Sequence, residues 1–91
     1  MDRIQLNKDL IRDEGMSLDV YQDSLGYFTI GIGHLLGTRK RMVEITSSEC
    51  AALFDMDVSS AEVIAKSLVI QWGKLDGVRQ RALVNMAFNL G

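Results

Sequence analysis

Residues 26–34 read Gly-Tyr-Phe-Thr-Ile-Gly-Ile-Gly-His and decide how the first half of the chain folds. Alternate residues from Phe28 to Ile32 are apolar, which is typical of a β-strand. Residues 23–26 have the composition of a turn, and a strand is expected before them over residues 18–21. The stretch therefore predicts a β-hairpin in which Thr29 shares one face with Tyr27 and the glycines. The opposite, apolar face consists of Phe28, Ile30 and Ile32.

Helices are expected on both sides of this hairpin. Apolar residues at helical spacing predict a short amphipathic helix over residues 3–13, which ends near Gly15. Residues 46–49, Thr-Ser-Ser-Glu, form a capping-box pattern and mark the start of a long helix. Asp76 is a suitable N-cap for a last helix over residues 77–90. The apolar stripe of the long helix comprises Cys50, Leu53, Phe54, Val58, Ala61, Ile64, Ala65 and Leu68.

Length and composition bound the class of protein. The 91 residues suffice for one small domain, and the elements above predict an α+β fold that is mainly α. The net charge of -2 argues against a dedicated nucleic-acid binder, and no run approaches the ~18 apolar residues of a membrane helix. The first residues lack the apolar core of a signal peptide. A single cysteine, Cys50, makes a reducing compartment the default.

Two patterns that could bind a cofactor or a metal fail on inspection. The glycines between Gly31 and Gly37 are spaced one residue too far apart for a dinucleotide-binding loop, and no helix opens after them. The stretch that begins at Asp55 starts like a calcium loop, but Ser60 replaces the required glycine and Lys66 replaces the bidentate glutamate. We expect no cofactor and no metal.

His34 and Asp57 are expected to form a structural pair. Asp57 lies on the apolar stripe of the long helix, where a carboxylate needs a partner. His34 is the only histidine of the chain and follows the predicted hairpin strand. A proton-carrier role for His34 is the alternative, but pairing with Asp57 accounts for both residues.

Glu14 and Asp23 are candidate catalytic carboxylates. Glu14 ends the first helix, Asp23 enters the hairpin turn, and the strand between them lets both face one cleft. Glycosidic hydrolysis needs such a pair, since one acid protonates the leaving oxygen and one carboxylate acts on water or the anomeric carbon. The hydroxyl of Thr29 could reach a substrate past its small neighbours. Two acids nine residues apart are a weak signal, and from the residues alone a helix-end charge and a turn aspartate are the better interpretation.

Three stretches of the first half of the chain together resemble the signature of the phage-type lysozymes. They are Asp13-Glu-Gly15, Tyr21-Gln-Asp23 and the run from Gly26 to Leu36. The second half agrees, because Leu53-Phe54 and Asp57-Val58 resemble the long connecting helix of that family, and residues 75–91 resemble its central helix. The resemblance implies a lysozyme-like fold, with a small antiparallel β-lobe, a connecting helix and a helical lobe.

The resemblance also implies a function and a role for each site residue. Glu14 would be the general acid, Asp23 the second carboxylate and Thr29 the hydroxyl that helps to hold the attacking water. Leu35 and Phe88 match positions that line the sugar-binding cleft. The chain would then be an endolysin-type muramidase, which hydrolyses the β-1,4 linkage between N-acetylmuramic acid and N-acetylglucosamine in bacterial peptidoglycan. Such an enzyme would accumulate in the cytoplasm of an infected bacterium and act on the wall after release.

The chain departs from the family pattern in two places. The connection between Leu36 and Thr46 is short, and the helices that follow the central helix in the family are absent. We therefore expect one partial domain and self-association through the apolar run Ala82–Leu90. The alternative to a muramidase is a catalytically silent fragment that binds sugar or associates with itself. The expected division is a helix over 1–13, a β-lobe over 14–45, a connecting helix over 46–70 and the start of a helical lobe over 71–91.

Overall fold

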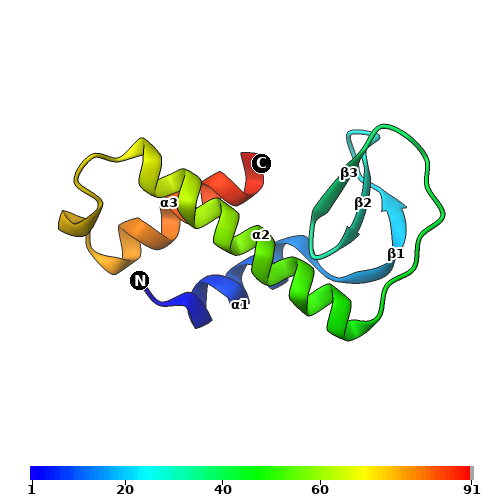
Figure 1. The fold of residues 1–91 in the computed structure, drawn as a ribbon, viewed down its shortest axis with the longest axis horizontal. Coiled ribbons are helices and arrows are strands. Elements are labelled where there is room, and N and C mark those ends of the chain that lie inside the picture. Colours follow the sequence, from blue (N-terminus) through cyan, green and yellow to red (C-terminus); the bar gives the residue numbers. More distant parts are fainter. Residues whose placement is uncertain (91) are drawn as a thin grey trace.

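A computed structural model describes residues 1–90 as an elongated molecule with extents of 44 × 24 × 18 Å. A β-lobe lies at one end, a group of helices lies at the other, and the long helix α2 joins them (Figure 1). The fold is α+β and mainly α, as predicted. The elements are α1 (Arg3–Glu14), β1 (Ser17–Gln22), β2 (Phe28–Gly31), β3 (His34–Gly37), α2 (Ser47–Leu68), the 3₁₀ helix η1 (Trp72–Lys74) and α3 (Gly77–Leu90).

The β-lobe contains three antiparallel strands in the order β1-β2-β3 rather than the two of the predicted hairpin. The alternation from Phe28 to Ile32 predicted one continuous strand, but β2 ends at Gly31 and the chain turns through Ile32 and Gly33 into β3. Gly31 and Gly33 have φ angles of +66° and +67°, a region that glycine adopts readily and other residues avoid. Because the alternation of apolar residues continues across this turn, the pattern predicted one strand instead of a strand and a turn.

The long helix begins at the predicted capping box. The Thr46 hydroxyl accepts a hydrogen bond from the Glu49 amide at 3.1 Å, and the Glu49 carboxylate accepts one from the Thr46 amide at 3.0 Å. These two bonds satisfy amide groups at the start of α2 that have no partner within the helix.

A single core lies where the helices meet and extends to the β-lobe. Leu6 and Leu10 of α1 pack with apolar residues of α2 and α3, and Ile32 joins them from the β2–β3 turn. Arg3 of α1 also donates a hydrogen bond at 2.9 Å to Glu62 of α2. The buried residues from α2 and α3 are Cys50, Phe54, Val58, Ala61, Ala65, Val84 and Ala87.

The distal half of α2 is less buried than the sequence predicted. Ile64 and Leu68 belong to the predicted apolar stripe but are 45% and 76% exposed. No element within residues 1–90 covers that side of α2 beyond α3. A hollow of about 170 Å³ remains between the two helices. It is lined by Ile64, Ala65, Leu68, Val69, Leu83, Met86, Ala87 and Leu90, which we call the α2–α3 groove. None of the helices within residues 1–90 is long and apolar enough to cross a membrane.

Candidate active site

Glu14 is held at the junction between the helical part and the β-lobe. It is the last residue of α1, and the helix stops there because the Gly15 amide donates to the Ile11 carbonyl at 2.8 Å and the chain leaves towards β1. Partial burial raises the pKa of the Glu14 carboxyl, and the negative charge of Asp13 raises it further. A carboxyl with a raised pKa keeps its proton to higher pH, which is the property that a general acid needs.

Asp23 is fixed by the turn between β1 and β2. Its Oδ1 atom accepts hydrogen bonds from the backbone amides of Leu25 and Tyr27, each at 2.9 Å. Its own amide donates to the Tyr27 carbonyl at 2.8 Å. The side chain therefore closes the turn through one oxygen and keeps Oδ2 for other partners.

Thr29 and Tyr21 lie side by side on neighbouring strands. They are register partners between β1 and β2, so their side chains share one face of the sheet. Thr29 is buried, with 5% of its surface exposed, and its hydroxyl lies 3.4 Å from the Tyr27 carbonyl. The pKa of Tyr21 is raised, first by burial and then by the charges of Glu14 and Asp23. The negative charges of both acids therefore disfavour ionisation of the Tyr21 hydroxyl.

These side chains line a single hollow of about 310 Å³. Glu14, Asp23 and Thr29, which the sequence analysis singled out, all border it, and so do Leu35 of β3 and Phe88 of α3. The β-lobe supplies one wall and the last turn of α3 supplies the other. Residues of the lining that the sequence analysis did not assign to the site are Tyr21, Leu25, Tyr27, Gly33, Asn89 and Leu90.

Three of these additional residues had a signal in the sequence. Tyr27 and Gly33 share the face of Thr29 in the predicted hairpin. Tyr21 lies two residues before Asp23, and side chains two apart in a strand point to the same face. Asn89 and Leu90 had no such signal, because only the packing of α3 beside the β-lobe brings them to the hollow. Leu25 lies in the turn after Asp23, and turn composition does not show which way its side chain points.

Phe88 belongs to both the site and the core. Its ring packs edge-on against the ring of Phe54, with centroids 6.0 Å apart and an interplanar angle of 74°. Leu35 on the opposite wall is 47% exposed and has no comparable anchor. Both residues border the same hollow, but Phe88 is anchored by its packing on Phe54 and Leu35 is held less firmly.

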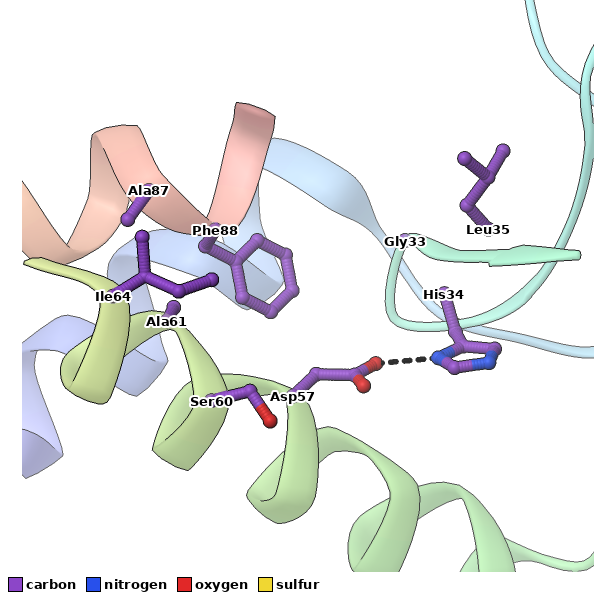
Figure 2. Close-up of a pocket in the computed structure, with 9 residues that line it drawn as sticks. All are labelled: Gly33, His34, Leu35, Asp57, Ser60, Ala61, Ile64, Ala87 and Phe88. Atoms are coloured by element: carbon purple, nitrogen blue, oxygen red, sulfur yellow. Dashed lines mark hydrogen bonds and ion pairs between the residues drawn. The ribbon is translucent and has the colours of Figure 1, made fainter. Parts of the chain in front are cut away.

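The His34–Asp57 pair borders a second hollow of about 200 Å³ beside the first (Figure 2). His34 Nδ1 lies 2.7 Å from Asp57 Oδ2, and both side chains are mostly buried. The pair joins β3 to α2, as predicted. The two hollows share Gly33, Leu35 and Phe88, so the pair is adjacent to the two carboxylates without being among them.

The described part of the chain contains no cluster of three histidine, cysteine or acidic side chains arranged to hold a metal ion. The chemistry of the first hollow is that of two carboxyls, a threonine hydroxyl, tyrosine hydroxyls and apolar surface. This set can donate and accept protons and can hold a polar ring against apolar side chains.

Comparison with known proteins identifies the family. A model of the phage lysozyme family matches residues 12–91, which include both carboxylates and both glycines of the β2–β3 turn. The chain belongs to the phage lysozyme family. This lysozyme relative matches probable T4-type lysozymes 1 and 2 of Dictyostelium discoideum at 36% and 34% identity, in each case over 92% of its own length. It also matches the pre-baseplate central spike protein Gp5 of Enterobacteria phage T4, at 35% identity over 90% of its own length and 18% of that protein.

The chain spans 65% of the length of each Dictyostelium protein. The alignments with them run over 110 positions, more than the 91 residues of this chain. The relatives therefore carry residues inside the matched region that this lysozyme-family chain lacks. A shorter connection between β3 and α2 is the difference that the sequence analysis expected.

Proposed function

We propose that this protein is a muramidase, which hydrolyses the β-1,4 linkage between N-acetylmuramic acid and N-acetylglucosamine in bacterial peptidoglycan. The observation that carries the proposal is that Glu14 and Asp23 border one hollow, in which burial raises the pKa of Glu14. A glycosidase needs one protonated and one ionised carboxyl on either side of the scissile bond. Membership of the phage lysozyme family supports the same reaction.

The proposed reaction assigns a task to each polar residue. Glu14 donates its proton to the glycosidic oxygen as the bond from the anomeric carbon to that oxygen breaks. A water molecule held by Thr29 and by the carboxylate of Asp23 adds to the anomeric carbon, and Asp23 takes up the proton that this water loses. The hydrogen bonds from the backbone to Asp23 Oδ1 fix the carboxylate for this task.

Leu35 and Phe88 are proposed to hold the sugar rings. Both border the hollow from opposite walls, where the flat ring of Phe88 and the branched side chain of Leu35 offer apolar contact to a sugar ring. The hydroxyls and N-acetyl groups of the glycan would then meet the polar residues of the β-lobe. This contact explains why an acid–base pair lies in a hollow with apolar walls.

The test is digestion of purified peptidoglycan. We expect new reducing ends on N-acetylmuramic acid, detected by borohydride reduction and mass spectrometry of the fragments. Glu14→Gln removes the proton donor while it keeps the shape of the side chain, and we expect it to reduce the rate by about 10²–10⁴-fold. Reducing ends on N-acetylglucosamine alone would reject the proposal, and so would equal rates for the parent protein and Glu14→Gln.

The second candidate is a catalytically silent relative that binds sugar or associates with a second copy of itself. The observation that favours it is the α2–α3 groove, whose lining is entirely apolar and partly exposed. A two-fold dimer brings the same patch of both copies together, so an apolar patch can cover itself.

Sedimentation at several concentrations distinguishes this candidate from a monomeric enzyme. Met86 lines the groove, whereas Met56 is similarly exposed on α2 outside it. If the groove is the interface, Met86→Lys abolishes a concentration-dependent dimer and Met56→Lys leaves it unchanged. A monomer at every concentration would reject self-association.

A further inference from the structure

Gly33 lies directly against the carboxyl of Glu14. A β-carbon at position 33 would be 2.7 Å from Glu14 Oε2, 3.0 Å from Cδ and 3.1 Å from Cγ. Carbon atoms that are not bonded pack at about 3.5–4.0 Å, and a contact of 2.7 Å is too short even for carbon and oxygen. A side chain at position 33 and the present position of the Glu14 carboxyl therefore exclude each other. The backbone of the β2–β3 turn thus forms the surface on which the carboxyl lies.

Gly31 provides the matched comparison two residues earlier. Its φ angle is +66°, against +67° for Gly33, so both positions impose the same backbone demand. A β-carbon at position 31 would meet Cys50 Sγ at 3.5 Å, and its other neighbours would be farther away. That distance is an ordinary contact. The conformation alone accounts for Gly31, whereas Gly33 must also leave room for Glu14.

The atoms that a side chain at position 33 would displace belong to the flexible end of Glu14. They can move by rotation about the side-chain torsions, while the backbone on either side is held by the sheet. The cost of a methyl group at position 33 therefore appears mainly as a displaced carboxyl rather than as an unfolded chain.

We propose that Gly33 is a positioning residue for Glu14: the bare backbone at position 33 seats the acid in the hollow that it shares with Asp23 and Thr29. The effect on catalysis rests on the proposed function, but the close contact between Gly33 and the Glu14 carboxyl is a property of the fold. A displaced carboxyl would move towards solvent, which would lower its pKa and misalign it with the glycosidic oxygen. Misplacement of a catalytic group by about 1 Å costs on the order of 10²-fold in rate.

The experiment compares Gly33→Ala with Gly31→Ala, because both variants carry the same backbone strain. We expect Gly33→Ala to reduce kcat on peptidoglycan fragments by about 10²-fold more than Gly31→Ala, with KM changed less than about threefold. The titration of the Glu14 carboxyl, followed by carbon NMR, should move to lower pH in Gly33→Ala alone. Equal losses of kcat in both variants, or an unmoved Glu14 titration, would overturn the proposal.

A variant that fails to fold is also informative. If Gly33→Ala does not fold, the same substitution is made together with Glu14→Ala, which removes the atoms that the new methyl group would meet. If the second substitution restores folding, the result supports the contact between position 33 and the Glu14 carboxyl as the cause. Continued failure to fold, while Gly31→Ala folds, contradicts the proposal. The NMR titration and the folding measurement need no activity, so a chain without muramidase activity rejects the proposed function and leaves the role of Gly33 to be decided separately.

Discussion

The two walls of the carboxylate hollow are built in different ways. The β-side wall draws Glu14, Asp23, Thr29 and Gly33 from one continuous stretch, and it is held by a helix end, a turn and strand pairing. The helical wall comes from the last turn of α3, more than fifty residues later in the chain, and depends on the packing of α3 against α2. The candidate catalytic residues are therefore brought together by local structure, whereas the opposite wall of the hollow depends on contacts between distant parts of the chain.

The two regions also differ in how completely their polar groups are paired and their apolar side chains are buried. In the β-side wall, polar groups such as the Asp23 carboxylate have backbone partners. Behind the helical wall, Ile64 and Leu68 remain exposed in the α2–α3 groove. Hydrogen bonds within a short stretch need no partner from a distant part of the chain. An apolar helix face, by contrast, is removed from water only when another surface packs against it.

The strongest test of the local wall is Asp23→Asn. The amide oxygen of asparagine can still accept from the amides of Leu25 and Tyr27, so the turn should persist while the charge is lost. We expect muramidase activity to fall by about 10²–10⁴-fold with little change in melting temperature. Asp19→Asn on β1, outside the hollow, is the charge-matched control. Activity retained in Asp23→Asn would leave Asp23 as a turn residue only.

Phe88→Ala and Leu35→Ala compare the two walls directly. Phe88 packs on Phe54, so its loss should reduce the free energy of unfolding by about 2–4 kcal/mol as well as weaken substrate binding. Leu35 is half exposed, and its loss should cost less than about 1 kcal/mol while KM still rises. Urea unfolding and steady-state kinetics measure both quantities. Equal stability losses would contradict the distinction between an anchored and a loose wall.

The His34–Asp57 pair tests how firmly the two regions are joined. Removal of either partner, in His34→Gln or Asp57→Asn, should lower the free energy of unfolding by about 1–2 kcal/mol. In the double variant the losses should fall short of additive by about 1 kcal/mol, because the 2.7 Å contact is lost only once. Since the pair borders the second hollow, kcat should stay within about threefold. Additive losses in urea unfolding would show that the contact contributes nothing.

The smallest expected effect is a pH dependence at Glu14. Its pKa is raised in the folded state, so its contribution to stability is present below the unfolded pKa and is lost as pH rises through the folded pKa. Glu14→Gln should therefore be more stable than the parent near neutral pH, by on the order of 1–3 °C, and equal to it in acid. Activity of the parent should likewise decline as pH rises through the Glu14 pKa.

Glu49 provides a control of opposite sign. Hydrogen bonds with Thr46 lower the pKa of the Glu49 carboxyl. Its contribution to stability is therefore present above its unfolded pKa and is lost as pH falls through the folded pKa. Glu49→Gln should be no more stable than the parent near neutral pH. A gain there equal to that of Glu14→Gln would point to a general effect of charge rather than to burial of Glu14.

Local rules accounted for much of the fold. The capping box at Thr46 and Glu49 lies where the pattern predicted it, because a cap depends on residues three apart. The third strand was missed, because apolar alternation continued through Ile32 into the turn. The prediction that the apolar stripe is buried along the whole of α2 was also wrong, because Ile64 and Leu68 are exposed. Periodicity shows which residues share a face of a helix, but not whether another element covers that face.

Local sequence patterns were enough to bring the candidate catalytic residues together. Glu14, Asp23 and Thr29 lie in a short stretch whose turns and strand pairing follow from neighbouring residues, and these elements suffice to bring them together. Patterns along the chain did not show that α3 ends beside these residues or that Gly33 lies against Glu14, and Phe88 was assigned to the cleft only through the family resemblance. The physical reason is range, since hydrogen bonds and steric limits act within a few residues, whereas packing depends on which distant surfaces meet.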